Sequence, residues 1–155
     1  MLKIEIVKRA DGDGLLRCTR ADGSVTWQKQ ANRHAAHFTY HDLTHFAVET
    51  TLGYKQGFFG LIASGWDIED TTGKGPRGPI PPEAGEVERI VGLFDTERAS
   101  GTLWTAEEFA QYTTPNLTRI LDDATIQAIR SARSDLFRRW SEVATGGKLE
   151  LSTVE

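Results

Sequence analysis

The sequence predicts an α+β fold in which an N-terminal antiparallel β-meander packs against four to five α-helices. Over residues 2–30 hydrophobic and polar residues alternate, which is the period of a strand with one buried face. Beyond residue 39 the apolar residues recur every three to four positions, which is the period of an amphipathic helix. Because the apolar face of a small sheet needs a cover, we expect the helical part to supply it.

The strands are marked by alternation and by the turns between them. The residues expected on the buried face of the meander are Leu2, Ile4, Ile6, Leu16, Cys18, Val25 and Trp27. Residues 11–14 (DGDG) and 22–23 (DG) supply the turn residues that tight hairpins need, so three antiparallel strands are expected. Residues 148–154 alternate again and predict a C-terminal strand that joins the same sheet.

Residues 39–145 are predicted to be helical apart from one long loop. The expected helices cover residues 39–52, 55–64, 83–99, 105–112 and 115–144. Residues 66–82 are rich in glycine and proline and predict a loop that is either a mobile lid or a simple connector. Gly57 and Gly60 lie inside the second apolar helix, where glycine indicates close approach of a neighbouring group.

Capping residues predict where several of the helices begin or end. Thr39 with Asp42, and Thr105 with Glu108, have the spacing of a capping box at a helix start. Gly53 is expected to end the first helix in the left-handed conformation. The first helix is therefore predicted to start at Thr39 and to end before Gly53.

The last helix carries several arginines outside its apolar stripe. Arg133, Arg138 and Arg139 are interleaved there with Asp135 and Glu142. Charges of both signs in this arrangement are typical of a solvated helix face, and this interpretation is favoured over an anion-binding patch.

Length and composition restrict the class of protein. A chain of 155 residues is expected to form one domain, 1–155, with its own core. The net charge of −4 gives no general attraction to nucleic acid or to anionic lipid. No apolar run is long enough for a membrane span, and the single cysteine, Cys18, excludes an internal disulfide. The first residues lack the features of a signal peptide, so a cytoplasmic location is expected.

The histidines are concentrated in one segment. All four, His34, His37, His41 and His45, lie within twelve consecutive residues. His41 and His45 are separated by one helical turn plus about 40°, and Glu49 continues the same row. Imidazole nitrogen and carboxylate oxygen bind divalent ions such as Zn²⁺, Fe²⁺, Mn²⁺ and Ni²⁺. The sequence thus predicts a divalent metal site made by His41, His45 and Glu49, with zinc as the first candidate, while His34 and His37 are weaker candidates.

Asp42 lies between the two histidines of the predicted site. In addition to capping the helix, it is a candidate ligand, an orienting group or a general base for a metal-bound water. The letters His-Asp-Leu-Thr-His have the spacing of the zinc-protease motif with aspartate in place of glutamate. The sequence therefore makes Asp42 the candidate catalytic residue.

The run HDLTHFAVETTLGYKQGFFGLIASGWDI resembles a signature of small bacterial proteins of uncharacterised function, in which an HDLxHxxxE helix leads into a GFFG segment. By motif matching, the resemblance singles out His41, Asp42, His45 and Glu49. The His-Asp-x-x-His part is also similar to the zinc-type motif of a ubiquinone-biosynthesis family, whose pattern has a glutamate where this chain has Gly57. These resemblances indicate the same helix as the site and imply no substrate.

Three classes of function follow from these patterns. The first is a divalent-metal-binding protein, with a metal-dependent hydrolase or lyase as its enzymatic form. The second is a non-enzymatic interaction protein in which the histidines are structural and the loop 66–82, with Trp66, forms a partner surface. The third is a regulator that senses pH through its imidazoles. The partner, a small molecule or a protein, and the oligomeric state are left open.

Overall fold

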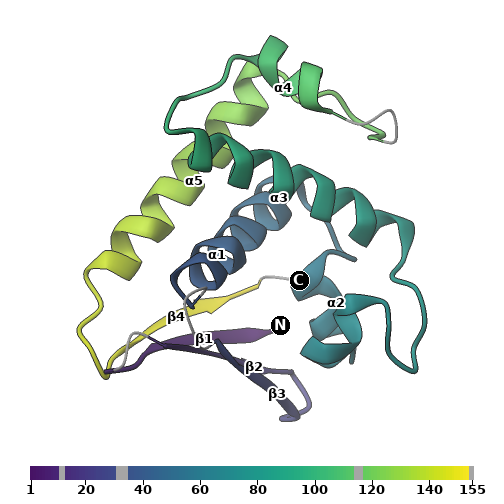
Figure 1. The fold of residues 1–155 in the computed structure, drawn as a ribbon. Coiled ribbons are helices and arrows are strands. Elements are labelled where there is room, and N and C mark those ends of the chain that lie inside the picture. The colour runs from purple at the N-terminus through teal and green to yellow at the C-terminus, as the bar shows by residue number, and fades with distance from the viewer. Residues whose placement is uncertain (11–12, 31–34, 114–116, 154–155) are drawn as a thin grey trace.

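The computed structural model describes residues 1–10, 13–30, 35–113 and 117–153, and it confirms the α+β fold (Figure 1). One antiparallel sheet has the strand order β3-β2-β1-β4, with helices packed over one of its faces. The strands are β1 (Lys3–Lys8), β2 (Gly14–Thr19), β3 (Val25–Gln30) and β4 (Lys148–Ser152). The helices are α1 (Ala35–Leu52), α2 (Phe58–Ala63), η1 (Ile68–Thr72), α3 (Pro82–Ser100), α4 (Ala106–Tyr112) and α5 (Asp123–Ser141).

The predicted C-terminal strand joins the sheet. β4 pairs with β1 so that Leu151 lies opposite Ile4 and Leu149 lies opposite Ile6. These four side chains are buried on the helix-covered face, together with Cys18 of β2. Burial raises the pKa of the Cys18 thiol to about 12, so Cys18 is a packing residue, as expected, and carries no thiolate at neutral pH.

The prediction for the buried face of β3 is wrong. Val25 is 37% exposed and Trp27 is 61% exposed, whereas Thr26 and Gln30 are buried. The register pairs Thr26 with Cys18, so it is Thr26 that shares the core face. The Thr26 hydroxyl accepts a hydrogen bond from the Ile68 amide at 3.1 Å. Hydrogen bonding therefore compensates the burial of polar side chains on this strand, while its hydrophobic residues face outward.

Because Trp27 is exposed, we expect Trp27→Thr to change the free energy of unfolding by less than about 0.5 kcal/mol. Leu16→Ala, on the buried face of the adjacent strand, is expected to cost about 2–5 kcal/mol. Urea unfolding of both variants provides the measurement. A loss of several kcal/mol for Trp27→Thr would contradict the register described above.

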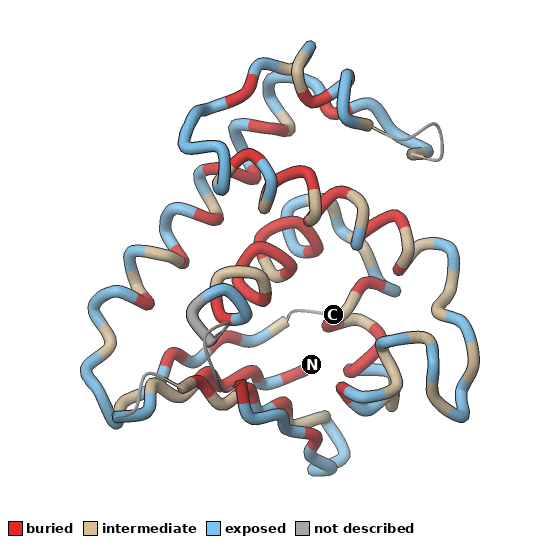
Figure 2. Tube along the Cα trace, viewed as in Figure 1, coloured by how far each residue is buried: buried red, intermediate tan, exposed pale blue. Residues whose placement is uncertain are grey.

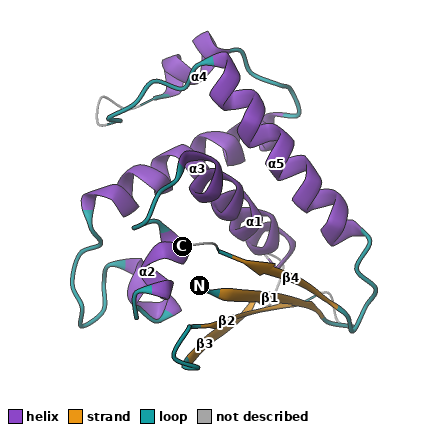
Figure 3. Cartoon of the chain, turned by 180° about the vertical axis from the view of Figure 1, so that it is seen from behind, coloured by secondary structure: helices purple, strands orange, loops and turns teal. Residues whose placement is uncertain are grey.

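α1 is the central helix of the fold. It lies over the sheet and packs against α3 and α5, with α2 nearby, as the two opposite views show (Figures 1 and 3). Its middle, residues 42–49, is buried except at Phe46, which is partly exposed (Figure 2). One hydrophobic cluster fills the space between α1 and the sheet, and a second joins α1 to α3, α4 and α5. No helix in the described residues combines the length and the apolar character that crossing a membrane requires.

The start of α1 differs from the prediction. The helix begins at Ala35, so Thr39 and Asp42 are inside it and form no capping box. The Thr39 hydroxyl instead donates to Oε1 of Gln30, and Nε2 of Gln30 donates to Asp42. Both polar side chains thus connect α1 to β3. The predicted end is confirmed, because α1 stops at Leu52 and Gly53 has a φ of 72°.

α2 is shorter than the predicted helix 55–64, because it covers Phe58–Ala63, so Gly57 precedes the helix and only Gly60 lies inside it. The glycines flanking the start of α2 do sit against neighbouring groups, Gly57 against Glu49 and Gly60 against the Lys55 carbonyl. The loop 66–82 contains a short 3₁₀ helix, η1, which the glycine and proline content did not predict. Asp67 and Asp70 form a capping box at its start.

The start of the last helix is also corrected. α5 begins at Asp123, not at 115, and the Asp122 side chain caps it by accepting from the Thr125 amide at 2.8 Å. Thr118 lies outside the helix, and its amide and hydroxyl donate to Glu86 of α3. α3 and α4 occur where predicted. The Thr105 and Glu108 capping box is present at the start of α4.

The predicted solvated arginine face is only partly correct. Arg138 is exposed and Arg139 is partly buried, but Arg133 is buried and its Nη2 lies 3.0 Å from Oε1 of Glu97. Arg130 is buried as well and binds the other oxygen of the same carboxylate. A single buried glutamate on α3 therefore pairs with two arginines of α5.

Candidate metal centre

The histidine row of α1 faces two carboxylates of α3. His41 contacts Asp95, and His45, one turn later, contacts Glu88 seven residues earlier, so the two helices run antiparallel. Two groups of three side chains have ligand atoms within 4.8 Å of one another: His41, His45 and Glu88, and His37, His41 and Asp95. The described residues thus bring His, Asp and Glu side chains close enough to hold a metal ion.

His45 is the most buried member of the row, with 1% of its surface exposed. Its Nδ1 lies 3.1 Å from Oε2 of Glu49, within hydrogen-bond geometry. Its Nε2 lies 3.2 Å from Oε1 of Glu88, yet it forms no hydrogen bond within the described part of the chain. Burial alone would lower the pKa of His45, but the carboxylates of Glu49 and Glu88 outweigh burial and raise the pKa to about 10.

His41 has a similar arrangement one turn earlier. Its Nδ1 lies 2.6 Å from Oδ2 of Asp95, and its ring meets that of His45 edge-on with centroids 4.8 Å apart. The second oxygen of Asp95, Oδ1, is buried and has no hydrogen-bond partner among the described residues. The side chain of His41 is 28% exposed, so the row opens toward solvent on this side.

Glu49 is placed beside His45, as the sequence predicted, but on the opposite ring nitrogen from Glu88. Its carboxylate accepts from the Phe59 amide at 3.1 Å and from the Gly60 amide at 3.3 Å in addition to His45. Glu49 belongs to neither group of candidate ligands. Its predicted role as a ligand stays a prediction, whereas its contact with Nδ1 fits an orienting group.

Asp42 is buried on the sheet side of α1, where it accepts a hydrogen bond from Gln30 of β3. Burial raises its pKa to about 6, although the Gln30 hydrogen bond and the nearby His45 and His41 act in the opposite direction. Its predicted catalytic role is untested by these contacts.

Of the two remaining histidines, the structure describes His37. His37 is exposed and stacks on His41, with ring centroids 5.7 Å apart. It belongs to the second candidate group with Asp95. His34 lies outside the described residues.

Sequence reasoning missed the two acidic residues of α3. Glu88 and Asp95 are seven residues apart, which places them on one helix face, and they flank the apolar stripe that predicted this helix. This spacing identifies Glu88 and Asp95 as site residues only once it is known that α3 packs against α1. The partner helix of a histidine row is not encoded in local periodicity.

Comparison with protein-family models, with curated proteins and with solved structures finds no match to this chain. The resemblances of residues 41–68 therefore stay predictions. The function is therefore inferred from the geometry of the site.

Proposed function

We propose that the protein binds a divalent metal ion, zinc in the first instance, between α1 and α3 through His41, His45 and Glu88. The observation that carries this proposal is Nε2 of His45, a buried ring nitrogen that has no hydrogen bond with the described residues and lies 3.2 Å from the Glu88 carboxylate, with the ring of His41 beside it. Buried polar atoms without partners are rare, and an ion would satisfy this one. Two imidazoles and a carboxylate are a common ligand set for catalytic zinc.

The hydrogen bonds of the two histidines support the choice of ligand atoms. Asp95 holds Nδ1 of His41, and Glu49 holds Nδ1 of His45. A carboxylate on Nδ1 fixes the ring and leaves Nε2 for the ion, which is the usual arrangement around protein-bound zinc. In this proposal Glu49 and Asp95 orient the ligands, and Glu88 supplies the coordinating oxygen.

The enzymatic form of the proposal is a metal-dependent hydrolase or lyase. Three protein ligands leave a fourth position on the ion for water, whose pKa the metal lowers. The Glu88 side chain is 44% exposed, so this position is accessible from solvent. Asp42, one residue from His41, is proposed as the assisting carboxylate, acting through its charge from the sheet side.

Metal content tests the proposal. Protein purified from zinc-supplemented cells is expected to contain about one metal ion per chain, and the stripped protein is expected to rebind zinc in calorimetry. His41→Ala, His45→Ala and Glu88→Gln are each expected to weaken zinc binding by more than about 100-fold, because loss of an orienting group alone costs about 10- to 100-fold. Circular dichroism checks that each variant is folded.

His37→Ala is the matched control. It removes an exposed imidazole that stacks on His41 but supplies none of the proposed ligand atoms, so zinc affinity is expected to stay within about threefold. A large loss of zinc affinity in His37→Ala, with no loss in Glu88→Gln, would indicate that the ion binds instead to the group of His37, His41 and Asp95.

A second candidate function is a non-enzymatic interaction protein in which the histidines are structural. The observation that favours it is the position of His45 between Glu49 and Glu88, where a protonated ring with a raised pKa forms an internal ion pair without any metal. This candidate predicts metal-free protein that does not bind zinc at millimolar concentration. It also predicts that His45→Ala destabilises the fold to the same extent with and without a chelator.

A further inference from the structure

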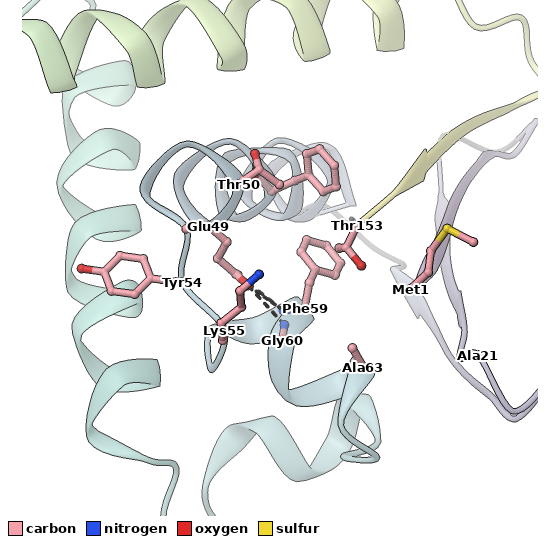
Figure 4. A pocket seen from close by; sticks show the side chains of 12 residues that line it. Met1, Ala21, Glu49, Thr50, Tyr54, Lys55, Phe59, Gly60, Ala63 and Thr153 are labelled. Atoms are coloured by element: carbon pink, nitrogen blue, oxygen red, sulfur yellow. Dashed lines mark hydrogen bonds between the residues drawn. The ribbon is translucent and has the colours of Figure 1, made fainter. Parts of the chain in front are cut away.

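A cavity of about 290 Å³ lies on the other side of Glu49 from the histidine row, between the second half of α1, α2 and the start of the chain (Figure 4). This volume is near the lower end of the range for small-molecule sites, about 300–1,000 Å³. The residues that define its two ends are Glu49, Lys55, Phe46, Phe59, Ala63 and Met1. Glu49, which orients His45 in the proposed metal site, also lines this cavity, whereas the proposed ligands His41, His45 and Glu88 do not.

One end of the cavity is polar. Glu49 and Lys55 lie there, and Figure 4 shows the Lys55 amine pointing into the cavity. The Glu49 carboxylate already accepts hydrogen bonds from His45 and from the Phe59 amide. Lys55 makes no hydrogen bond or ion pair with the residues that the structure describes. The available charge at this end is therefore the positive charge of Lys55.

The other end is apolar. Phe46 and Phe59 both line the cavity, with their rings in an edge-on contact. Ala63 and Met1 lie farther along from Phe59 (Figure 4). Apolar surface of this kind gains about 0.8 kcal/mol for each methylene that it takes out of water, which is roughly a threefold gain in affinity. A ligand that matches both ends has an anionic head and a short apolar body.

We propose that this cavity binds a small monocarboxylate with an aliphatic or aromatic body of about six to eight carbons, a size that the volume allows. The carboxylate pairs with Lys55, and the apolar body lies along Phe46 and Phe59 toward Ala63. The proposed metal ligands take no part in this site, because its lining contains neither a histidine nor Glu88.

Titration of the full chain with hexanoate, hexanol and hexylamine, followed by NMR chemical shifts in the presence of a chelator, tests the proposal. Hexanoate is expected to bind about three- to tenfold more tightly than hexanol, which corresponds to one partly exposed ion pair, and hexylamine more weakly than either. Lys55→Ala is expected to reduce the affinity for hexanoate to that for hexanol and to leave hexanol unchanged. Lys74→Ala, an exposed lysine outside the cavity, is the control and should change neither.

Ala63→Phe tests the location of the site, because Ala63 is an exposed residue whose enlargement fills the cavity. All three ligands are expected to lose at least about tenfold in affinity, and thermal unfolding verifies the fold of the variant. Three results overturn the proposal: no saturable binding, tighter binding of hexylamine than of hexanoate, or unchanged hexanoate binding in Lys55→Ala. Glu88→Gln, which removes the proposed metal ligand, should leave hexanoate binding intact, so failure of one site is distinguishable from failure of the other.

Discussion

Glu97→Gln is expected to lower the free energy of unfolding by about 3–5 kcal/mol, because it leaves two buried arginines without their counter-charge. Glu97 is 1% exposed, and its Oε2 accepts from the Trp104 amide at 3.0 Å and from Nε of Arg130 at 3.1 Å. Its Oε1 accepts from Arg133. The carbonyls of Trp104 and Phe94 complete the partners of the two guanidinium groups. An amide in place of the carboxylate keeps the shape but removes the charge.

Urea unfolding of the variant provides the measurement, with Glu142→Gln as the matched control. Glu142 is an exposed carboxylate that pairs with Arg138 on the same helix, so the same chemical change there is expected to have no measurable effect. Equal effects of the two substitutions would show that the Glu97 cluster contributes no more than a surface ion pair.

The contribution of Glu97 is also expected to depend on pH. Burial alone would raise its pKa, but hydrogen bonds from Arg130 and Trp104 and the charges of both arginines outweigh burial and lower the pKa below its ordinary value of 4.5. A carboxylate with a lowered pKa stabilises the fold fully above its unfolded pKa and loses that contribution as the pH falls through the folded pKa. The stability difference between the protein and Glu97→Gln is therefore expected to be constant above about pH 5.5 and to shrink below about pH 4.5.

The features that the sequence predicted correctly are determined by neighbouring residues. Alternation placed β1, β2 and β4, and the Thr105 and Glu108 capping box placed the start of α4, because a capping box needs only residues of one turn. Gly53 follows α1 in the left-handed conformation for the same local reason.

The errors arise where tertiary contacts overrode a local pattern. Thr39 and Asp42 have the spacing of a cap, but both contact Gln30 of β3, and the helix continues past them toward the N-terminus. On β3 itself, pairing with β2 turned Thr26 inward and Trp27 outward, although the residue types suggested the reverse. Neither contact can be derived from local periodicity.

The candidate site also has one part that local spacing predicts and one part that depends on tertiary packing. The row of His41, His45 and Glu49 follows from helical spacing alone and is present as predicted. Glu88, which faces Nε2 of His45, and Asp95, which contacts Nδ1 of His41, lie about 40–55 residues further along the chain, and only the packing of α3 on α1 brings them there. As a result, helical spacing predicts Glu49 as the carboxylate ligand, whereas Glu88 is that ligand in the proposed site.

Gly57→Ala is expected to damage the fold and the proposed metal site together. The backbone of Gly57 is extended, so any residue can adopt it and the effect comes from contact alone. A methyl group there would lie 2.6 Å from Cγ of Glu49 and closer still to its carboxyl carbon. The carboxylate cannot retreat without losing its bonds to Phe59 and His45. We expect a loss of about 3 kcal/mol in stability and about 10- to 100-fold in zinc affinity.

Two companion variants separate the steric effect from the loss of the orienting group. Gly92→Ala adds a methyl group to the interior of α3 with no atom within 4 Å, so it is expected to raise stability by up to about 1 kcal/mol. Glu49→Gln keeps the shape beside Gly57 and is expected to weaken zinc binding as Gly57→Ala does. If Gly57→Ala binds zinc normally although its stability falls, Glu49 serves only to hold α2 against α1. Equal loss of zinc affinity in both variants would instead identify the Glu49 contact with Nδ1 of His45 as the link between the packing of α2 and the metal site.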